Sequence, residues 1–131
     1  MRFEHAAAYG MGVVLPLLEA LRRRTNFHPI SSYVDDFIAG ALLLYAARAV
    51  SRGRPNGPAW LAAAWGVLCG GLYGSFFYQL GATHDVSGVA NSIVVLVKGA
   101  LYAVALAGLA LSVRSAAAVP SSARRAPEER P

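Results

Sequence analysis

The chain has 131 residues, of which 56% are hydrophobic and only 15% charged. An ordinary soluble domain carries about 25% charged residues, so this composition excludes a disordered regulator and argues against a water-soluble globular enzyme. Twelve basic residues against seven acidic ones give a net charge of +5, but the sequence shows no basic-aromatic motif of the RNA-binding kind, and we expect no nucleic-acid partner.

The first apolar segment, residues 3–21, is the weakest candidate for a membrane span. Its uncharged part, Ala6 to Leu18, is thirteen residues long and contains Pro16. Apolar stretches of about 10–14 residues more often form re-entrant or interfacial pieces. A secretory signal fits poorly, because three arginines stand where a cleavage site would follow. We expect the segment to span with local thinning of the bilayer, and a three-span protein is the alternative.

Two longer segments follow. Residues 33–50 carry Asp35 and Asp36 at their start and Arg48 near their end, where the charges can reach the headgroup layer. Residues 58–80 contain no charge at all. A helix of that length measures about 33 Å, enough for a hydrocarbon core of about 30 Å. Both segments are therefore predicted to cross the membrane.

The last apolar segment, residues 91–113, is interrupted only by Lys98. The remainder, residues 114–131, is rich in Ala, Ser, Pro and Arg and cannot bury apolar surface. The sequence thus predicts an all-α integral membrane protein. Residues 1–113 are expected to form a small bundle of four transmembrane helices, and residues 114–131 a disordered basic cytoplasmic tail.

The arginines predict the orientation of the bundle. Three of them, Arg22 to Arg24, fall on one side of the membrane, and eight fall on the side of the two termini. Because cytoplasmic loops carry the excess of basic residues, both termini are predicted cytoplasmic. Eleven arginines to one lysine, with a high alanine content, are typical of a GC-rich bacterium. We therefore expect a multi-pass protein of the bacterial inner (plasma) membrane. The eight arginines are Arg2, Arg48, Arg52, Arg54, Arg114, Arg124, Arg125 and Arg130.

Small residues predict how helices pack in the bilayer. Gly66, Gly70 and Gly74 are spaced by four, so they lie on one helix face where another backbone can approach closely. Gly99 begins a similar stripe in the last segment. Two interpretations stay open: packing within the chain, or an interface with a second copy or a larger membrane complex.

Polar residues gather at the predicted outer ends of the spans and define a candidate outer polar pocket. Lys98 lies about 10 Å below the outer end of its helix, where a charge costs about 2.5–3.5 kcal/mol. An ion pair with Asp35 or Asp36 would accommodate it. The alternatives are snorkelling of the lysine, or a role as ligand counter-charge, proton site or catalytic amine. The two aspartates also suit a helix first turn. The pocket residues are Lys98, Asp35, Asp36, Glu19, Gln79, Tyr78, Asn91 and Tyr102.

No metal or cofactor is predicted. His5, His28 and His84 lack the spacing of metal ligands, and neither His-Glu-x-x-His nor Cys-x-x-Cys occurs. The single cysteine, Cys69, lies in an apolar span and is expected to be an inert packing residue. Nucleophile elbow, phosphate-loop and dinucleotide motifs are also absent from the sequence.

Three functions remain open. The favoured one is a non-enzymatic bundle that self-associates or joins a larger membrane complex through its glycine face. The second is binding or transport of a small solute or ion in the outer polar pocket. The third is a membrane-embedded enzyme acting on a lipid or another hydrophobic substrate, for which the sequence names no catalytic residue.

Overall fold

The structure, a computed structural model, describes residues 2–23, 30–85 and 87–118. All regular secondary structure in this part of the chain is helical, which confirms the predicted all-α bundle. The helices are α1 (Phe3–Arg23), α2 (Ile30–Ser51), α3 (Gly57–Gly81) and α4 (Asn91–Ala117). By length and composition, α3 and α4 alone among them could cross a membrane.

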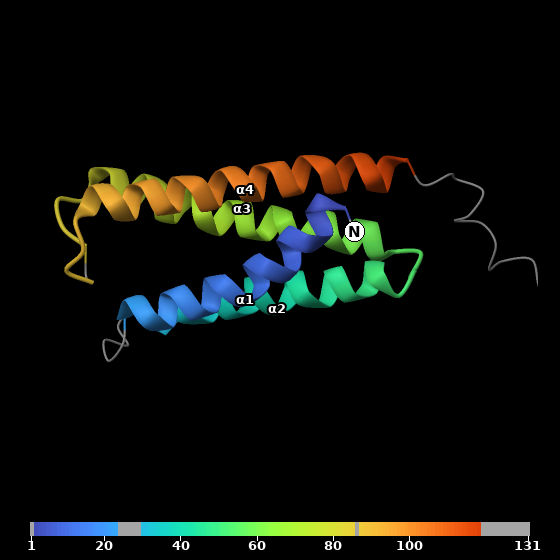
Figure 1. Ribbon diagram of the computed structural model, residues 1–131, viewed down its shortest axis with the longest axis horizontal. Coiled ribbons are helices and arrows are strands. Elements are labelled where there is room, and N and C mark those ends of the chain that lie inside the picture. Colours follow the sequence, from blue (N-terminus) through green and yellow to red (C-terminus); the bar gives the residue numbers. More distant parts are fainter. Residues whose placement is uncertain (1, 24–29, 86, 119–131) are drawn as a thin grey trace, which may run out of the picture.

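The helices run up and down in sequence order (Figure 1). α1 packs on α2, α2 on α3 and α3 on α4, whereas α1 meets α4 over a smaller area. We call one end of the bundle the terminal end. It contains the start of α1, the α2–α3 connection and the last turns of α4. We call the opposite end the far end. It contains the last turn of α1, the first turns of α2 and the α3–α4 connection.

The helix bounds differ from the predicted spans mainly at the start of α2, three residues earlier than expected, and at the end of α4. This helix continues to Ala117, four residues past the expected end at Val113. The extra turn contains Ala116 and Ala117, and alanine is the strongest helix former. Residues 114–117 are therefore helical and do not belong to a disordered tail. Most of the predicted tail, residues 119–131, lies outside the described residues.

The core is centred on one face of α3. Leu61 and Trp65 of this helix are almost completely buried, and Leu43 of α2 and Ala105 of α4 are buried against them. Many of the other core residues are alanines. Small side chains let helix backbones approach closely, which is how helices gain van der Waals contact when lipid surrounds them.

Two close approaches depend on glycines that the sequence analysis did not single out. A Cβ on Gly40 of α2 would lie 2.8 Å from the carbonyl oxygen of Gly12 in α1, so the two backbones touch at this crossing. A Cβ on Gly108 of α4 would lie 2.5 Å from the Trp65 indole. Gly12, Gly40 and Gly108 thus pack within the chain, as do Gly57 against the backbone of Val50 and Gly99 against the ring of Phe76.

Candidate functional site

Three predicted pocket residues meet at the far end, between α3 and α4. Gln79, in the last turn of α3, is only 2% exposed. Its Oε1 accepts a hydrogen bond from Lys98 Nζ at 3.0 Å, and its Nε2 donates to Asn91 Oδ1 at 2.5 Å. Asn91 Nδ2 in turn donates to the backbone oxygen of Ala82 at 2.7 Å. The two amides therefore fasten the end of α3 to the start of α4 and hold the lysine.

The ammonium of Lys98 binds neutral oxygens of α3. Besides Gln79, it donates to the backbone oxygen of Ser75 at 3.4 Å. Among the described residues, no ion pair joins it to Asp35 or Asp36. The predicted pair does not form because α4 packs on α3, while the aspartates lie on α2, on the other side of the bundle. Because α2 begins at Ile30, Asp35 and Asp36 lie more than one turn inside the helix, and the expectation that they occupy its first turn is wrong. Asp36 attracts the lysine only at longer range.

A second group at the far end centres on Arg22, in the last turn of α1. Its Nη2 and Nε donate to the two carboxylate oxygens of Asp85 at 2.7 and 3.3 Å. Its Nη1 donates to Glu19 at 3.2 Å. Asp85 also accepts hydrogen bonds from the backbone N–H and the hydroxyl of Ser87. This fork ties α1 to the α3–α4 connection.

The charge of Asp85 is stabilised by these contacts. Its side chain is only 1% exposed, and burial by itself would raise the pKa of the carboxyl. The hydrogen bonds from Arg22 and Ser87 and the positive charge of Arg22 outweigh burial and hold the pKa of Asp85 well below its usual value. Sequence analysis treated Arg22 only as a topology signal. The signal in the sequence for this contact was that Arg22 and Asp85 are predicted to lie on the same side of the membrane.

Three further pocket residues, Asp35, Tyr78 and Tyr102, lie outside these two groups. Tyr78 is 79% exposed, and Asp35 is also exposed. The ring of Tyr102 stacks on Phe76 at a centroid distance of 6.1 Å. The predicted outer polar residues thus divide into a lysine–amide group, an Arg22 group that includes Glu19, the half-buried Asp36 of α2, and exposed or aromatic side chains.

The glycine ladder of α3 faces away from the core. A Cβ built on Gly66, Gly70 or Gly74 meets no atom within 4 Å. At about 100° per residue, these glycines lie on the opposite side of the helix from Leu61 and Trp65. No helix of the described chain covers this side. We call Gly66, Gly70 and Gly74 the glycine face.

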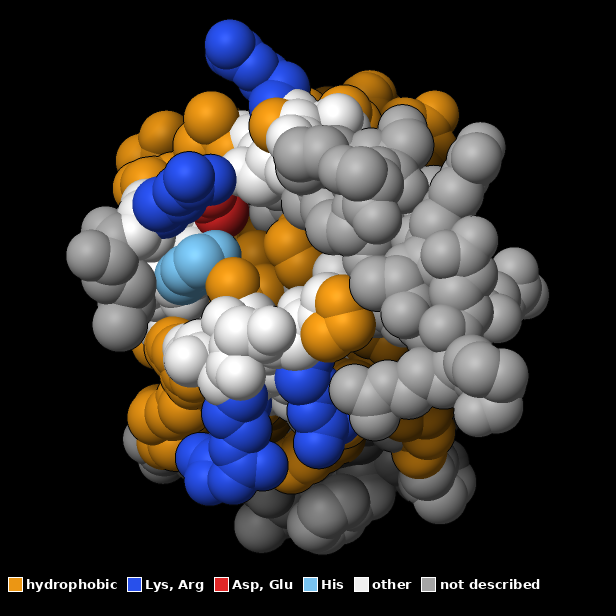
Figure 2. All heavy atoms as spheres, turned by 90° about the vertical axis from the view of Figure 1, so that its right-hand side faces the viewer, with side chains coloured by type: hydrophobic (Ala, Val, Ile, Leu, Met, Phe, Trp, Pro, Cys, Tyr) orange, Lys and Arg blue, Asp and Glu red, His pale blue; other side chains and the backbone are white. Residues whose placement is uncertain are grey.

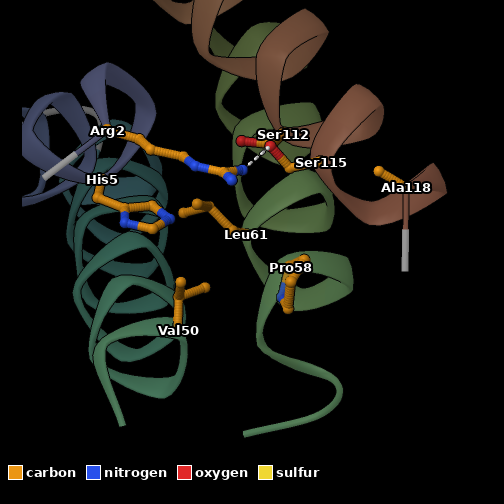
Figure 3. A pocket seen from close by; sticks show the side chains of 8 residues that line it. All are labelled: Arg2, His5, Val50, Pro58, Leu61, Ser112, Ser115 and Ala118. Atoms are coloured by element: carbon orange, nitrogen blue, oxygen red, sulfur yellow. Dashed lines mark hydrogen bonds between the residues drawn. The ribbon is translucent and has the colours of Figure 1, made fainter. Parts of the chain in front are cut away.

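A cavity of about 360 Å³ opens at the terminal end, far from Lys98 (Figure 3). Polar side chains from α1, from the residue before it and from α4 form one part of its wall, and apolar side chains from α2, from α3 and from the residue after α4 form the rest. Sequence analysis missed this site because its polar members come from the two opposite ends of the chain. The lining residues are Arg2, His5, Val50, Pro58, Leu61, Ser112, Ser115 and Ala118.

The histidines and the cysteine lie apart from one another. His5 lines the cavity, His84 is exposed beside Thr83, and His28 lies outside the described residues. Cys69 is buried in the core of the bundle. Within residues 2–23, 30–85 and 87–118, no three His, Cys, Asp or Glu side chains are grouped to hold a metal ion.

No protein-family model, curated protein or solved structure matches this chain. Its function is therefore inferred from its own residues and their arrangement.

Proposed function

We propose that this protein is a non-enzymatic, membrane-embedded bundle of four helices that self-associates through the glycine face of α3. The observation that carries this proposal is the orientation of Gly66, Gly70 and Gly74, which lie open on the side of α3 opposite the core. The alternative role for these glycines was packing within the chain. Glycines elsewhere in the bundle make those contacts instead.

Membrane embedding is supported by how little of the apolar helices the bundle covers. The most apolar windows of α3 and α4 are only 33% and 11% buried, whereas the core helix of a soluble protein would be mostly covered. Large apolar side chains such as Val67, Phe77 and Leu96 are exposed. In water such a surface would drive aggregation, and in lipid it is solvated. α1 and α2, with 21 and 22 residues, are about 30 Å long, so their length also suits the bilayer core, although their composition is less apolar than that of α3 and α4.

The distribution of charge supports an inner-membrane protein with both termini in the cytoplasm. Exposed arginines of α1, α2, the α2–α3 connection and α4 gather at the terminal end (Figure 2). At the far end, Arg22 is neutralised by Glu19 and Asp85. Arg22, one of the basic residues on the side opposite the termini, is therefore weakened as a signal against this orientation. The gathered arginines are Arg2, Arg48, Arg52, Arg54 and Arg114.

A second copy of the chain is the partner that this surface fits. The glycine face is an uncharged groove formed by residues without side chains, and beside it the exposed rings of Tyr73 and Phe77 pack on each other at a centroid distance of 4.7 Å. Such a groove next to an aromatic ridge is self-complementary, because the ridge of one copy can enter the groove of the other across a two-fold axis. Close contact of glycine backbones is a common way for membrane helices to associate.

The substitution Gly70→Leu tests this proposal. Because Gly70 is exposed and a Cβ there meets no neighbour, the larger side chain leaves the folded monomer intact and blocks only a partner. Native mass spectrometry of protein released from its membrane should show a multiple of 13.8 kDa for the unchanged protein. The Gly70→Leu variant should show mainly the monomer mass.

The matched control is Gly10→Leu, which makes the same change at an exposed and equally open glycine of α1. This variant should assemble like the unchanged protein. A monomeric unchanged protein, or a Gly70→Leu variant that assembles normally, would contradict the proposal. A mass that includes a different chain would identify a larger membrane complex instead of self-association.

A further inference from the structure

The cavity at the terminal end has a mostly apolar wall with four polar side chains on one part of it. Arg2, just before α1, and His5 of α1 extend toward α3 and α4, and Ser112 and Ser115 face them from α4 (Figure 3). The described residues that line the cavity include no acidic side chain. Its wall therefore suits a ligand that accepts hydrogen bonds and carries negative charge.

Ser112 is the clearest sign of a missing partner. The residue is 0% exposed, and its hydroxyl makes no hydrogen bond to any described residue. A second buried donor, the indole N–H of Trp65, is also unpaired in this part of the chain. The indole lies against Gly108, one helical turn before Ser112 on the same face of α4. A buried polar group without a partner is costly, so such groups mark places where a ligand or water completes the bonding.

Arg2 is held in place while most of its donors stay available. Its Nη1 donates to Ser115 Oγ at 3.1 Å, and that hydroxyl donates to Glu4 Oε1, also at 3.1 Å. The Glu4 carboxylate is buried behind this relay. A guanidinium has five N–H donors, and Ser115 takes only one of those of Arg2. The relay thus positions the guanidinium without neutralising it by direct contact.

We propose that this cavity binds the phosphate group of an anionic phosphate ester. A phosphate offers several acceptor oxygens to a guanidinium fork and to a hydroxyl such as that of Ser112, which are charge-assisted hydrogen bonds. A cavity of about 360 Å³ holds a phosphate together with a small organic group. Val50, Pro58 and Leu61 supply apolar contacts for the carbon part.

The surroundings of the cavity favour the same ligand. Exposed arginines of α2, the α2–α3 connection and α4 stand around the terminal end (Figure 2). Positive charge of this kind raises the local concentration of anions. The ester can come from a phospholipid headgroup or from a soluble metabolite, and both present the same phosphate chemistry. The inference does not depend on assembly through the glycine face.

Binding is tested by isothermal titration calorimetry on the full chain, purified in a non-ionic detergent and freed of lipid. The probes are glycerol 3-phosphate and dihexanoyl phosphatidylglycerol below its micelle concentration. We expect saturable binding of at least one probe. Arg2→Gln should weaken it by about tenfold or more, and Ser112→Ala by about fivefold. Arg114→Gln removes an equal charge from an exposed residue outside the cavity wall and should change binding less than about twofold.

Each outcome decides the proposal. Binding of the lipid probe alone assigns the site to a headgroup, and binding of glycerol 3-phosphate assigns it to phosphate esters in general. Failure of both probes would overturn the proposal. So would Arg2→Gln and Ser112→Ala variants that bind like Arg114→Gln. If Arg2→Gln unfolds the protein, as judged by circular dichroism, Ser112→Ala decides alone, since it removes a hydroxyl that the fold does not use.

Discussion

The two ends of the bundle use polar residues in opposite ways. At the far end, Lys98, Gln79 and Asn91 satisfy one another, and Arg22 holds Asp85. At the terminal end, a cavity is bordered by Ser112, whose buried hydroxyl has no partner among the described residues. The far end was the predicted binding site, yet the unused hydrogen-bonding capacity lies at the terminal end.

The difference shows that a cluster of polar residues is not by itself a binding site. A buried charge or amide is tolerated when each donor finds an acceptor, and a network closed in this way stabilises the fold. A ligand gains most where a buried donor is unpaired, because binding then removes the cost of an unsatisfied group. Free donors, rather than the number of polar residues, distinguish the two ends.

Among substitutions at the far end, Asp85→Ala is expected to have the largest effect on the free energy of unfolding. The change leaves the partly buried guanidinium of Arg22 without its two hydrogen bonds to Asp85. Loss of one partner of such a pair should lower the free energy of unfolding by about 3 kcal/mol. Unfolding in mixed micelles measures this. Asp35→Ala removes an exposed carboxylate from the same end and should have little effect. Equal effects of the two variants would contradict the assignment.

The same pair predicts how stability depends on pH. The pKa of Asp85 is lowered in the folded protein. Its ionised carboxylate therefore contributes fully to stability above the pKa of an aspartate in the unfolded chain, about 3.9. The contribution is lost as the pH falls below that value toward the lowered pKa. Unfolding measured at stepwise lower pH should therefore show a loss of stability below about pH 4. The loss should be smaller in Asp85→Asn, and an identical profile for the variant would exclude Asp85 as its source.

A smaller loss is expected from Gln79→Leu. The substitution removes the acceptor of Lys98 and the donor to Asn91 in a buried position, which should cost about 2 kcal/mol. Gln79→Glu keeps an acceptor for the lysine and should recover part of the loss. Unfolding of both variants in the same micelles provides the measurement. A leucine variant as stable as the unchanged protein would show that this network does not hold α3 to α4.

The smallest effect, at the terminal end, is predicted for Ser112→Ala. Because the hydroxyl has no partner among the described residues, its removal from ligand-free protein should leave the free energy of unfolding within about 0.5 kcal/mol or raise it slightly. Thermal unfolding of delipidated protein is the measurement. A loss comparable to that of Gln79→Leu would mean that the hydroxyl is already satisfied, and the contrast between the two ends would disappear.

The sequence by itself determined the four helices and their order. Long apolar stretches separated by Gly, Pro and charged residues specify helices locally, because each helix satisfies its own backbone hydrogen bonds. The sequence also predicted that the glycines spaced by four in residues 66–74 share one helix face, because the helical period places them there. The charge asymmetry of the arginines likewise depended only on their position beside apolar segments.

The tertiary structure alone decided what each face and each polar residue contacts. Lys98 is bound by Gln79 and not by an aspartate, because α4 packs on α3. The glycine face points outward, while Gly108 receives the Trp65 ring. Arg2 and Ser115, from opposite ends of the chain, meet at one cavity. Helix periodicity is local and repeats within each segment, whereas the choice of neighbouring helix depends on side-chain shape across the whole bundle.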